Sequence, residues 1–287
     1  MPMKDDTLRI LVPLDGSPLA ETILPALLPL VSSQATMLTL LKVINRVDEI
    51  EPARSYLSRL QKDVEGDRVE SVTRLEFGRP AEEILHLAQS KRYDFAAMTT
   101  HGRTGLRRAF MGSVAEEVLR HSAIPLFLNR PGTKIGDWKR IVVALDGSPV
   151  SEQILEEAAR LAGLLGATLH VVRVSLPLLP ETDMFFEPMS PAREEAGPYL
   201  DEISARLARR QILTVPVLRE GFAGVEITKY AAEIGAGLIM MMTEGRSGFP
   251  RFLSGSVAEE VLRSASCPVL IRRWTSAPEE KPVPALP

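Results

Sequence analysis

The strongest constraint on this chain is an internal repeat, because segments that recur in the same order indicate one domain built twice. The first half carries RILVPLDGSPLAE from Arg9, and the second half carries RIVVALDGSPVSE from Arg140. Both halves also carry GSVAEEVLR, which begins at Gly112 and again at Gly255. Shorter matches fall in the same order in each half. We therefore expect two domains of the same fold.

The boundary between the two copies is predicted at a short linker. Residues 1–130 and 138–273 form the expected domains, and Pro131–Asp137 carries the glycine and proline typical of a loop. Because so short a linker holds the halves close, we expect them to pack as an intramolecular pseudo-dimer. Residues 274–287 are rich in proline, a composition that predicts a disordered tail.

Each copy alternates apolar runs with helical patterns, which predicts an α/β fold. Ser17 and Pro18 mark a helix start, and further helices are predicted over Arg54–Val64, over Pro80–Gln89 and from Gly112. Continuous apolar runs indicate buried parallel strands, so we expect two tandem, doubly wound, five-stranded parallel sheets, Rossmann-like and ordered 3-2-1-4-5. The predicted strands are Leu8–Leu14, Thr36–Val43, Val69–Leu75, Phe95–Thr99 and Pro125–Leu128, then Ile141–Leu145, Thr168–Val174, Leu213–Val217, Leu238–Met242 and Val269–Ile271.

Composition and charge narrow the functional classes. Hydrophobic residues make up 45% of the chain and charged residues 25%, the mixture of a globular protein with a sizeable core. The net charge of -3 argues against nucleic acid as the main partner, since phosphate backbones attract basic surfaces. No apolar run is long enough for a bilayer, and acids stand where a signal peptide would be apolar. We therefore expect a cytoplasmic protein with neither a membrane nor a nucleic-acid partner.

Two glycine-containing segments predict a ligand site. Ligands of doubly wound sheets bind outside the carboxyl ends of the strands, where the strand order reverses. Pro13–Ser17 follows the first strand there, and Met98–Gly105 follows the fourth and leads to Gly112–Val114 at a helix start. Glycine-rich backbone and a helix N-terminus offer N–H groups to phosphate oxygens. Asp15 could hold a ribose, a base or a phosphate-bound metal, and Arg103 adds positive charge, so the pattern favours a nucleotide.

With these segments, each half resembles the universal stress protein family. The resemblance is carried by LDGSP, by the HGRTGL loop of the first half and by GSVAEEVLR. It covers nearly the whole chain outside the tail and the 177–191 loop. The resemblance implies a protein of the stress response. The ATP-binding branch of that family has a signature of Gly, two residues, Gly, nine residues, then Gly-Ser or Gly-Thr.

The first half matches most of that signature. Gly102 and Gly112-Ser113 fit it, while Thr99 stands where the first glycine is expected. The resemblance also implies that Val43 lies beside the base, and that Met98 and Val114 lie beside the ribose and phosphates. The nucleotide-binding residues so predicted are Pro13, Asp15, Val43, Met98, Thr99, Gly102, Arg103, Gly112, Ser113 and Val114.

The second half departs further from the signature. Gly245 and Gly255-Ser256 keep the spacing, but Met242 stands in place of the first glycine and Glu244 in place of a histidine. A carboxylate repels phosphates and Met is bulkier than Gly, so we expect the first half to hold the better site. A second, weaker site is predicted at Asp146, Val174, Gly245, Gly255, Ser256 and Val257.

Some of these residues also have structural interpretations that the sequence leaves open. Ser113 with Glu116, and Ser256 with Glu259, fit the S-x-x-E capping box at a helix start. Asp15 can serve only to turn the chain, since Asp-Gly is a common loop pair.

The histidines, the loop arginines and the cysteine are open in the same way. His101 can reach a phosphate or cap its loop, and the loop arginines can form a solvated face. The single cysteine, Cys267, excludes an internal disulfide and is expected to be a small buried hydrophobe. Three histidines within regular elements are expected to be structural: His86, His121 and His170.

The segment 177–191 has no counterpart of the same length in the first half. It carries Met184, Phe185, Phe186 and Met189 between prolines. Covering the second site, meeting a partner chain and tucking against its own domain all remain open for it.

The sequence favours a regulatory protein of the stress response that binds ATP or a related adenine nucleotide, mainly in its first domain. The cofactor implied is ATP, with or without Mg²⁺, and the partner is the nucleotide itself. Two alternatives stay open: a slow ATPase, and a protein-interaction module of the same family that binds no nucleotide. No G-x-x-x-x-G-K-[ST] loop, catalytic triad or zinc spacing occurs, so we predict neither catalytic nor metal-binding residues.

The resemblance further suggests how the domains associate. It implies pairing through the last strands, Pro125–Leu128 and Val269–Ile271. Within one chain this would join the two halves, and pairing of chains into a homodimer is left open.

Overall fold

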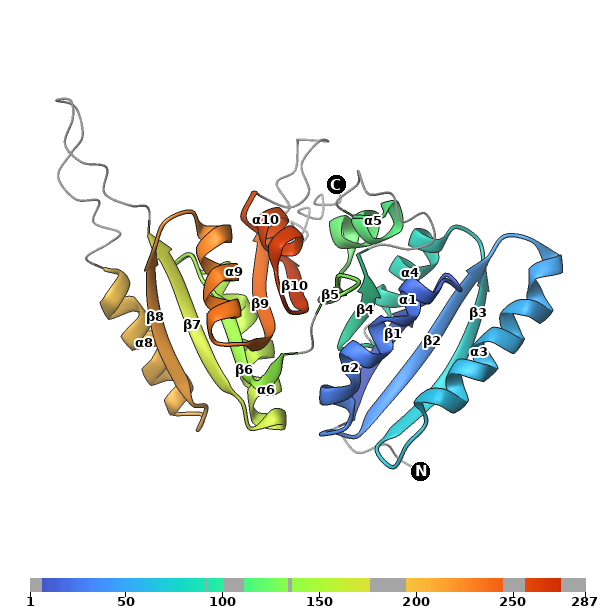
Figure 1. Ribbon diagram of the computed structural model, residues 1–287, viewed down its shortest axis with the longest axis horizontal. Helices are drawn as coiled ribbons and strands as arrows, with labels where there is room; N and C mark the ends of the chain where they lie inside the picture. The colour runs from blue at the N-terminus through green and yellow to red at the C-terminus, as the bar shows by residue number, and fades with distance from the viewer. Residues whose placement is uncertain are drawn as a thin grey trace, which may run out of the picture.

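The computed structural model describes residues 7–90, 92–100, 111–133, 136–175, 195–244 and 256–274. A ten-stranded sheet of order β3-β2-β1-β4-β5-β10-β9-β6-β7-β8 lies at its centre, and helices cover both faces (Figure 1). Within each half the strands are parallel and follow the order 3-2-1-4-5. The expected doubly wound α/β architecture is confirmed.

Continuous apolar runs form the inner strands, whose two faces the helices bury, whereas the edge strands β3 and β8 are partly exposed. Every residue of β4 is buried. The strands of the first half are β1 (Leu8–Pro13), β2 (Thr36–Ile44), β3 (Val69–Phe77), β4 (Phe95–Thr99) and β5 (Leu126–Asn129). Those of the second half are β6 (Asp137–Ala144), β7 (Thr168–Ser175), β8 (Thr214–Glu220), β9 (Ala236–Glu244) and β10 (Val269–Trp274).

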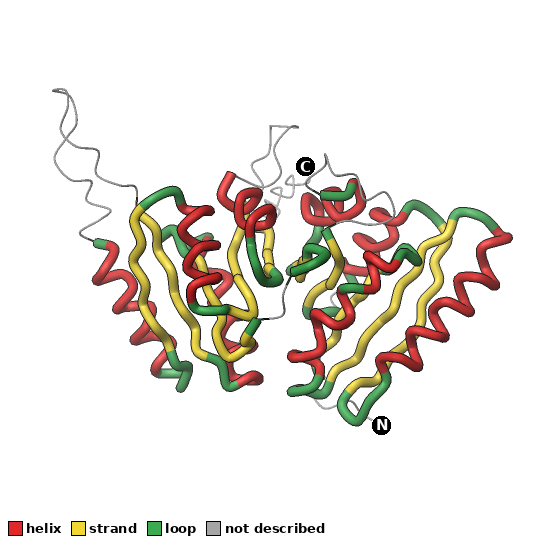
Figure 2. Tube along the Cα trace, in the orientation of Figure 1, coloured by secondary structure: helices red, strands yellow, loops and turns green. Residues whose placement is uncertain are grey.

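Helices form a layer on each face of the sheet (Figure 2). One face carries α1 (Pro18–Glu21), α2 (Ile23–Val31), α3 (Ile50–Val64), α6 (Ile154–Leu165) and α8 (Ala196–Ala208). The opposite face carries α4 (Pro80–Gln89), α5 (Ser113–His121), α9 (Ala223–Glu233) and α10 (Ser256–Ser264). Short 3₁₀ turns, η1 (Val47–Glu49) and η2 (Ser151–Gln153), precede α3 and α6.

Local sequence sets where these helices begin. Ser17 is the N-cap of α1 as predicted, with its hydroxyl oxygen accepting the Ala20 N–H at 3.1 Å. Helix α3 begins at Ile50 and not at Arg54, because Pro52 falls in its first turn, where a missing N–H costs no helical hydrogen bond.

Strands β5 and β10 pair antiparallel and join the two halves into one sheet. Val269, Leu270 and Ile271 lie opposite Leu128, Phe127 and Leu126. The last strands therefore associate within the chain, as the sequence led us to expect.

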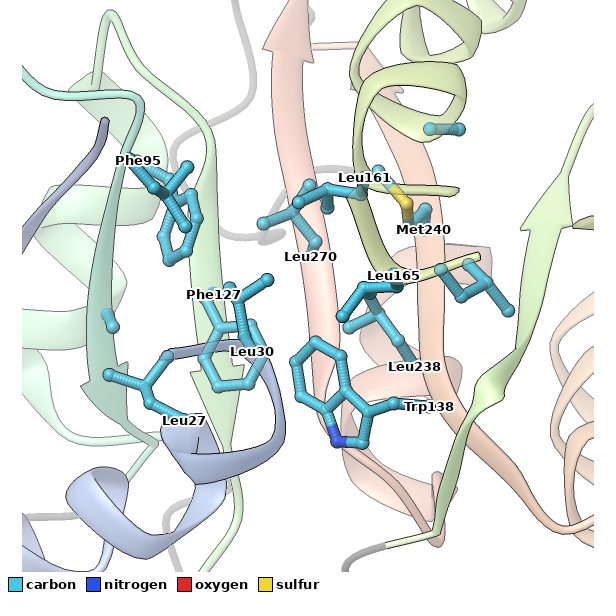
Figure 3. Packing of buried hydrophobic residues seen from close by; sticks show 14 of the residues in the cluster. Leu27, Leu30, Phe95, Phe127, Trp138, Leu161, Leu165, Leu238, Met240 and Leu270 are labelled. Carbon is cyan, nitrogen blue, oxygen red and sulfur yellow. The ribbon is translucent and has the colours of Figure 1, made fainter. Parts of the chain in front are cut away.

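A hydrophobic core continues across this junction (Figure 3). Phe127 stacks on Trp138 with ring centroids 5.8 Å apart, and Phe95 lies 6.0 Å from Phe127 on the other side. The labelled core residues are Leu27, Leu30, Phe95 and Phe127 from the first half, and Trp138, Leu161, Leu165, Leu238, Met240 and Leu270 from the second (Figure 3). The halves thus share one core on this face of the sheet.

Polar contacts also cross the junction. Arg160 forms an ion pair with Asp94 at 2.9 Å. The Arg130 guanidinium donates to the carbonyl oxygens of Arg263, at 2.5 Å, and Ala265, at 3.1 Å, just beyond the end of α10. These half-exposed contacts add little stability beside the shared core.

Some predicted features lie at the ends of the described ranges or outside them. The 177–191 loop and residues 275–287 of the predicted tail lie outside the described residues, while Trp274 ends β10. Asp137, predicted to close the linker, is the first residue of β6.

Among the helices of the described ranges, none has both the length and the apolar character needed to cross a membrane.

The shared core predicts that Phe127 stabilises both halves. Phe127→Ala should lower the free energy of unfolding by about 3–5 kcal/mol, because a fully buried ring leaves a cavity against Trp138. Urea unfolding measures the change. Phe77→Ala is the matched control, since Phe77 is 57% exposed at the end of β3. Equal stability of the two variants would contradict a core shared at this seam.

Candidate functional site

A cavity of about 760 Å³ opens at the carboxyl ends of β1, β2 and β4 in the first half. This is the point where the strand order reverses, the usual ligand position in such sheets. Its walls come from the β1–α1 turn, the ends of β2 and β4, and the starts of α3, α4 and α5. The described residues predicted for the first site all line it: Pro13, Asp15, Val43, Met98, Thr99, Gly112, Ser113 and Val114. Gly102 and Arg103 lie outside the described residues.

The β1–α1 turn presents Asp15 to this cavity. Asp15 Oδ1 accepts the Ser17 N–H at 2.8 Å, so its carboxylate closes the turn. Gly16 has a φ of +88°, in the left-handed region that favours glycine. Lys42 Nζ donates to the Asp15 carbonyl oxygen at 2.9 Å. The structural role left open for Asp15 is therefore present, and the residue still lines the cavity.

The N-terminus of α5 faces the same cavity. Gly112 is its N-cap, and the Gly112 N–H donates to the Thr100 carbonyl oxygen at 2.7 Å. The amides of the next residues, Ser113, Val114 and Ala115, are the helix-terminal donors that lack an intrahelical acceptor. All three residues line the cavity, and the helix end carries partial positive charge, so this wall suits an anion.

The capping-box interpretation of Ser113 is wrong. Ser113 is the first helical residue, one position inside the N-cap, and Glu116 instead forms an ion pair with Arg120 at 2.8 Å. The extended backbone of Gly112, with ψ at 149°, places the cap one residue earlier than the S-x-x-E pattern predicts.

Thr99 replaces the signature glycine without closing the cavity. It is 7% exposed and lies opposite Asn129 in the sheet, while the cavity remains open beside it. Thr100 is held by the backbone, with its N–H donating to the Asn129 carbonyl oxygen at 3.0 Å. The end of β4 is thus a fixed wall of the cavity.

Sequence reasoning missed Lys42 and Tyr56, which also line the cavity. Lys42 Nζ lies 5.3 Å from the centroid of the Tyr56 ring. Burial, and then the nearby Glu21 carboxylate, raise the pKa of Tyr56. A signal for both was present, because the repeat returns them as Arg173 and Tyr199.

The second half repeats the turn around Asp146. Asp146 Oδ1 accepts the Ser148 N–H at 2.8 Å, and Gly147 has a φ of +89°. Burial alone would raise the pKa of Asp146, but hydrogen bonds from Ser148 and Ser151 outweigh it and lower that pKa.

Of the other residues predicted for the second site, three lie near the ends of a strand or a helix and two lie outside the described residues. Val174 lies near the end of β7, and Ser256 and Val257 begin α10. Gly245 and Gly255 are outside the described residues.

The remaining candidate groups have structural surroundings. His170 Nδ1 lies 2.8 Å from the Tyr230 hydroxyl, and burial and then Arg140 lower the pKa of His170. Cys267 is buried, which raises the pKa of its thiol to about 12, so it is protonated near neutrality. Within the described ranges, no group of three or more His, Cys, Asp or Glu could hold a metal ion.

The chain is similar in sequence to known proteins of one family along most of its length. A sequence model of the universal stress protein family matches residues 7–130 and again 137–273. A universal stress protein of Mycobacterium tuberculosis is 30% identical over 227 residues, which is 75% of this chain and 74% of that protein. One from Methanocaldococcus jannaschii is 33% identical over 141 residues, covering 47% of this chain and 81% of that protein.

A solved structure shares the whole architecture. The crystal structure of a universal stress protein from Archaeoglobus fulgidus superposes with a TM-score of 0.72 and covers 92% of this chain and 96% of that chain. At 23% sequence identity, this likeness concerns the fold alone.

The lowered pKa of Asp146 predicts a pH-dependent contribution to stability. Because the folded-state pKa lies below the unfolded value, the ionised carboxylate stabilises the fold above the ordinary carboxyl range, about pH 4, and this is lost as pH falls through the folded pKa. Asp146→Asn should therefore be less stable than the unchanged protein at pH 7, and the difference should shrink in acid.

Urea unfolding at several pH values measures this difference. Asp201→Asn, on the exposed side of α8, serves as the control with one charge removed elsewhere. A deficit for Asp146→Asn that is as large at pH 3 as at pH 7 would show that the charge is not responsible.

Proposed function

The chain belongs to the universal stress protein family, and on that premise we propose that it is a regulatory protein that binds ATP or a related adenine nucleotide in the first-half cavity. One observation carries the proposal. The cavity at the strand-order reversal brings the Asp15 turn, the end of β4 and the N-terminus of α5 to a common space. These are the segments on which the nucleotide prediction rests.

The chemistry of the cavity walls fits such a ligand. Its volume of about 760 Å³ lies within the range of small-molecule sites. Val43 offers apolar surface for a base, Met98 lies where the ribose and phosphates are expected, and the amides at the start of α5 with the Ser113 hydroxyl offer donors for phosphates. Asp15 is the acceptor for a ribose hydroxyl or a base amine.

A magnesium ion would enter with the phosphates. Mg²⁺ usually binds through one or two carboxylates together with substrate phosphates, and Asp15 is a carboxylate at this cavity. The ion would neutralise phosphate charge there, while the chain supplies the amides that orient the phosphates.

Binding is favoured over catalysis by the described lining. Phosphoryl transfer needs a positioned nucleophile and cationic clamps around the transferred group. Among the described lining residues, Lys42 is the cation, and its ammonium group is held at the Asp15 carbonyl oxygen. We therefore place slow ATP hydrolysis second, and a protein-interaction module without nucleotide third.

Substitution of matched glycines tests the site and its location. Gly112→Val should abolish ATP binding, because the branched side chain crowds the cavity wall at the start of α5. Gly255→Val makes the same change before α10 and should affect binding less. Isothermal titration with ATP and Mg²⁺ measures both variants against the unchanged protein. Equal losses would contradict the assignment of the main site to the first half, and no binding by the unchanged protein would favour the third alternative.

Phosphate release separates a binder from an enzyme. Incubation with ATP and Mg²⁺ over hours should release no more phosphate than the Gly112→Val protein does. Release well above that control would establish the slow ATPase instead.

A further inference from the structure

A cluster of charged and aromatic side chains packs beside the Asp15 turn. Lys42 Nζ donates to the Asp15 carbonyl oxygen at 2.9 Å and lies over the Tyr56 ring, 5.3 Å from its centroid. The Arg59 guanidinium lies 5.5 Å from the same centroid and forms an ion pair with Glu21 at 2.8 Å. The cluster thus ties α3 and β2 to the β1–α1 turn.

The second half builds a similar cluster from its own copies of these segments. The Arg173 guanidinium lies 4.9 Å from the centroid of the Tyr199 ring. It packs so closely on the turn that a Cβ on Gly147 would lie 2.9 Å from a guanidinium nitrogen. Arg206 forms an ion pair with Glu152 at 2.5 Å. Both halves therefore place a cation between a tyrosine and the Asp-Gly-Ser turn.

The cluster is retained where the nucleotide signature is not. The second half has Met242 and Glu244 in the segment where the first half has Thr99 and His101. A cation is thus kept at this position in the half that departs further from the nucleotide signature, which favours a role tied to the turn. What both halves share is the turn itself, with its glycine at a φ of +88° or +89°.

A cation is well suited to hold such a turn. An ammonium group makes a charge-assisted hydrogen bond to a carbonyl oxygen, which is stronger than a neutral one. The Tyr56 ring face attracts the same charge and limits where the lysine side chain can lie. The carbonyl and the carboxylate of Asp15 belong to one residue. A hydrogen bond that fixes the backbone carbonyl therefore restricts the positions that the carboxylate can take.

We propose that Lys42 is a positioning residue, which anchors the Asp15 carbonyl and so orients the Asp15 carboxylate toward the nucleotide cavity. In the second half, Arg173 packs between the Tyr199 ring and the Asp146–Gly147 turn. The part of this inference that concerns ligand affinity rests on the proposed nucleotide function, whereas the part that concerns the turn does not.

Hydrogen exchange in the ligand-free protein tests the turn. Lys42→Met keeps the length of the side chain and removes its charge. The turn protects the Ser17 and Ala20 amides. Loss of a charge-assisted hydrogen bond worth about 1.4 kcal/mol should make hydrogen exchange at these two amides roughly tenfold faster. Lys42→Arg should restore slow exchange, since arginine fills this place in the second half. Lys62→Met, on the exposed side of α3, is the control and should exchange as the unchanged protein does.

Titration with ATP and Mg²⁺ on the same proteins tests the consequence for binding. Lys42→Met should bind roughly tenfold more weakly by the same energy, and Lys42→Arg should bind as the unchanged protein does.

Unchanged exchange in Lys42→Met would overturn the inference. So would weak binding by Lys42→Arg with normal exchange, since the lysine would then contact the ligand directly. If the unchanged protein binds no ATP, the proposed function fails, and exchange alone still decides the role of Lys42.

Discussion

Pairing of β5 with β10 is the interaction on which the rest of the structure depends. A strand at the edge of a sheet leaves N–H and C=O groups without partners, and the residues that pair here are apolar. Leu126–Leu128 and Val269–Ile271 satisfy each other antiparallel and place Phe127 against Trp138. The last strand of each half is therefore an interior strand of the full sheet, and the core on each face of the sheet contains residues of both halves.

The cavity follows from the order of strands rather than from any single residue. With β1 flanked by β2 on one side and β4 on the other, the chain leaves neighbouring strands toward opposite faces of the sheet and opens a space between. The Asp15 turn and the start of α5 then border that space from separate parts of the sequence. Hydrogen bonds within the chain hold both the Asp15 turn and the start of α5.

Strong local signals in the sequence made the bounds of many helices and strands predictable. Contacts between distant segments were not predictable in this way. The bounds of Pro80–Gln89 and Phe95–Thr99 follow from a proline at a helix start and an unbroken apolar run. The start of α3 was missed because a proline in the first turn resembles a helix breaker. Lys42 was missed because a lone lysine at a strand end looks like a solvated charge, and only the fold brings it to Tyr56 and Asp15.

The covalent link between the halves frees them to differ. Two identical chains that assemble through their last strands must carry identical sites, so any substitution changes both at once. Here the partner is part of the same polypeptide, and its local concentration does not depend on expression or dilution. Each copy can lose or alter its own site while the seam persists. The divergence of Met242 and Glu244 beside an intact β5–β10 pair is the outcome that such tethering permits.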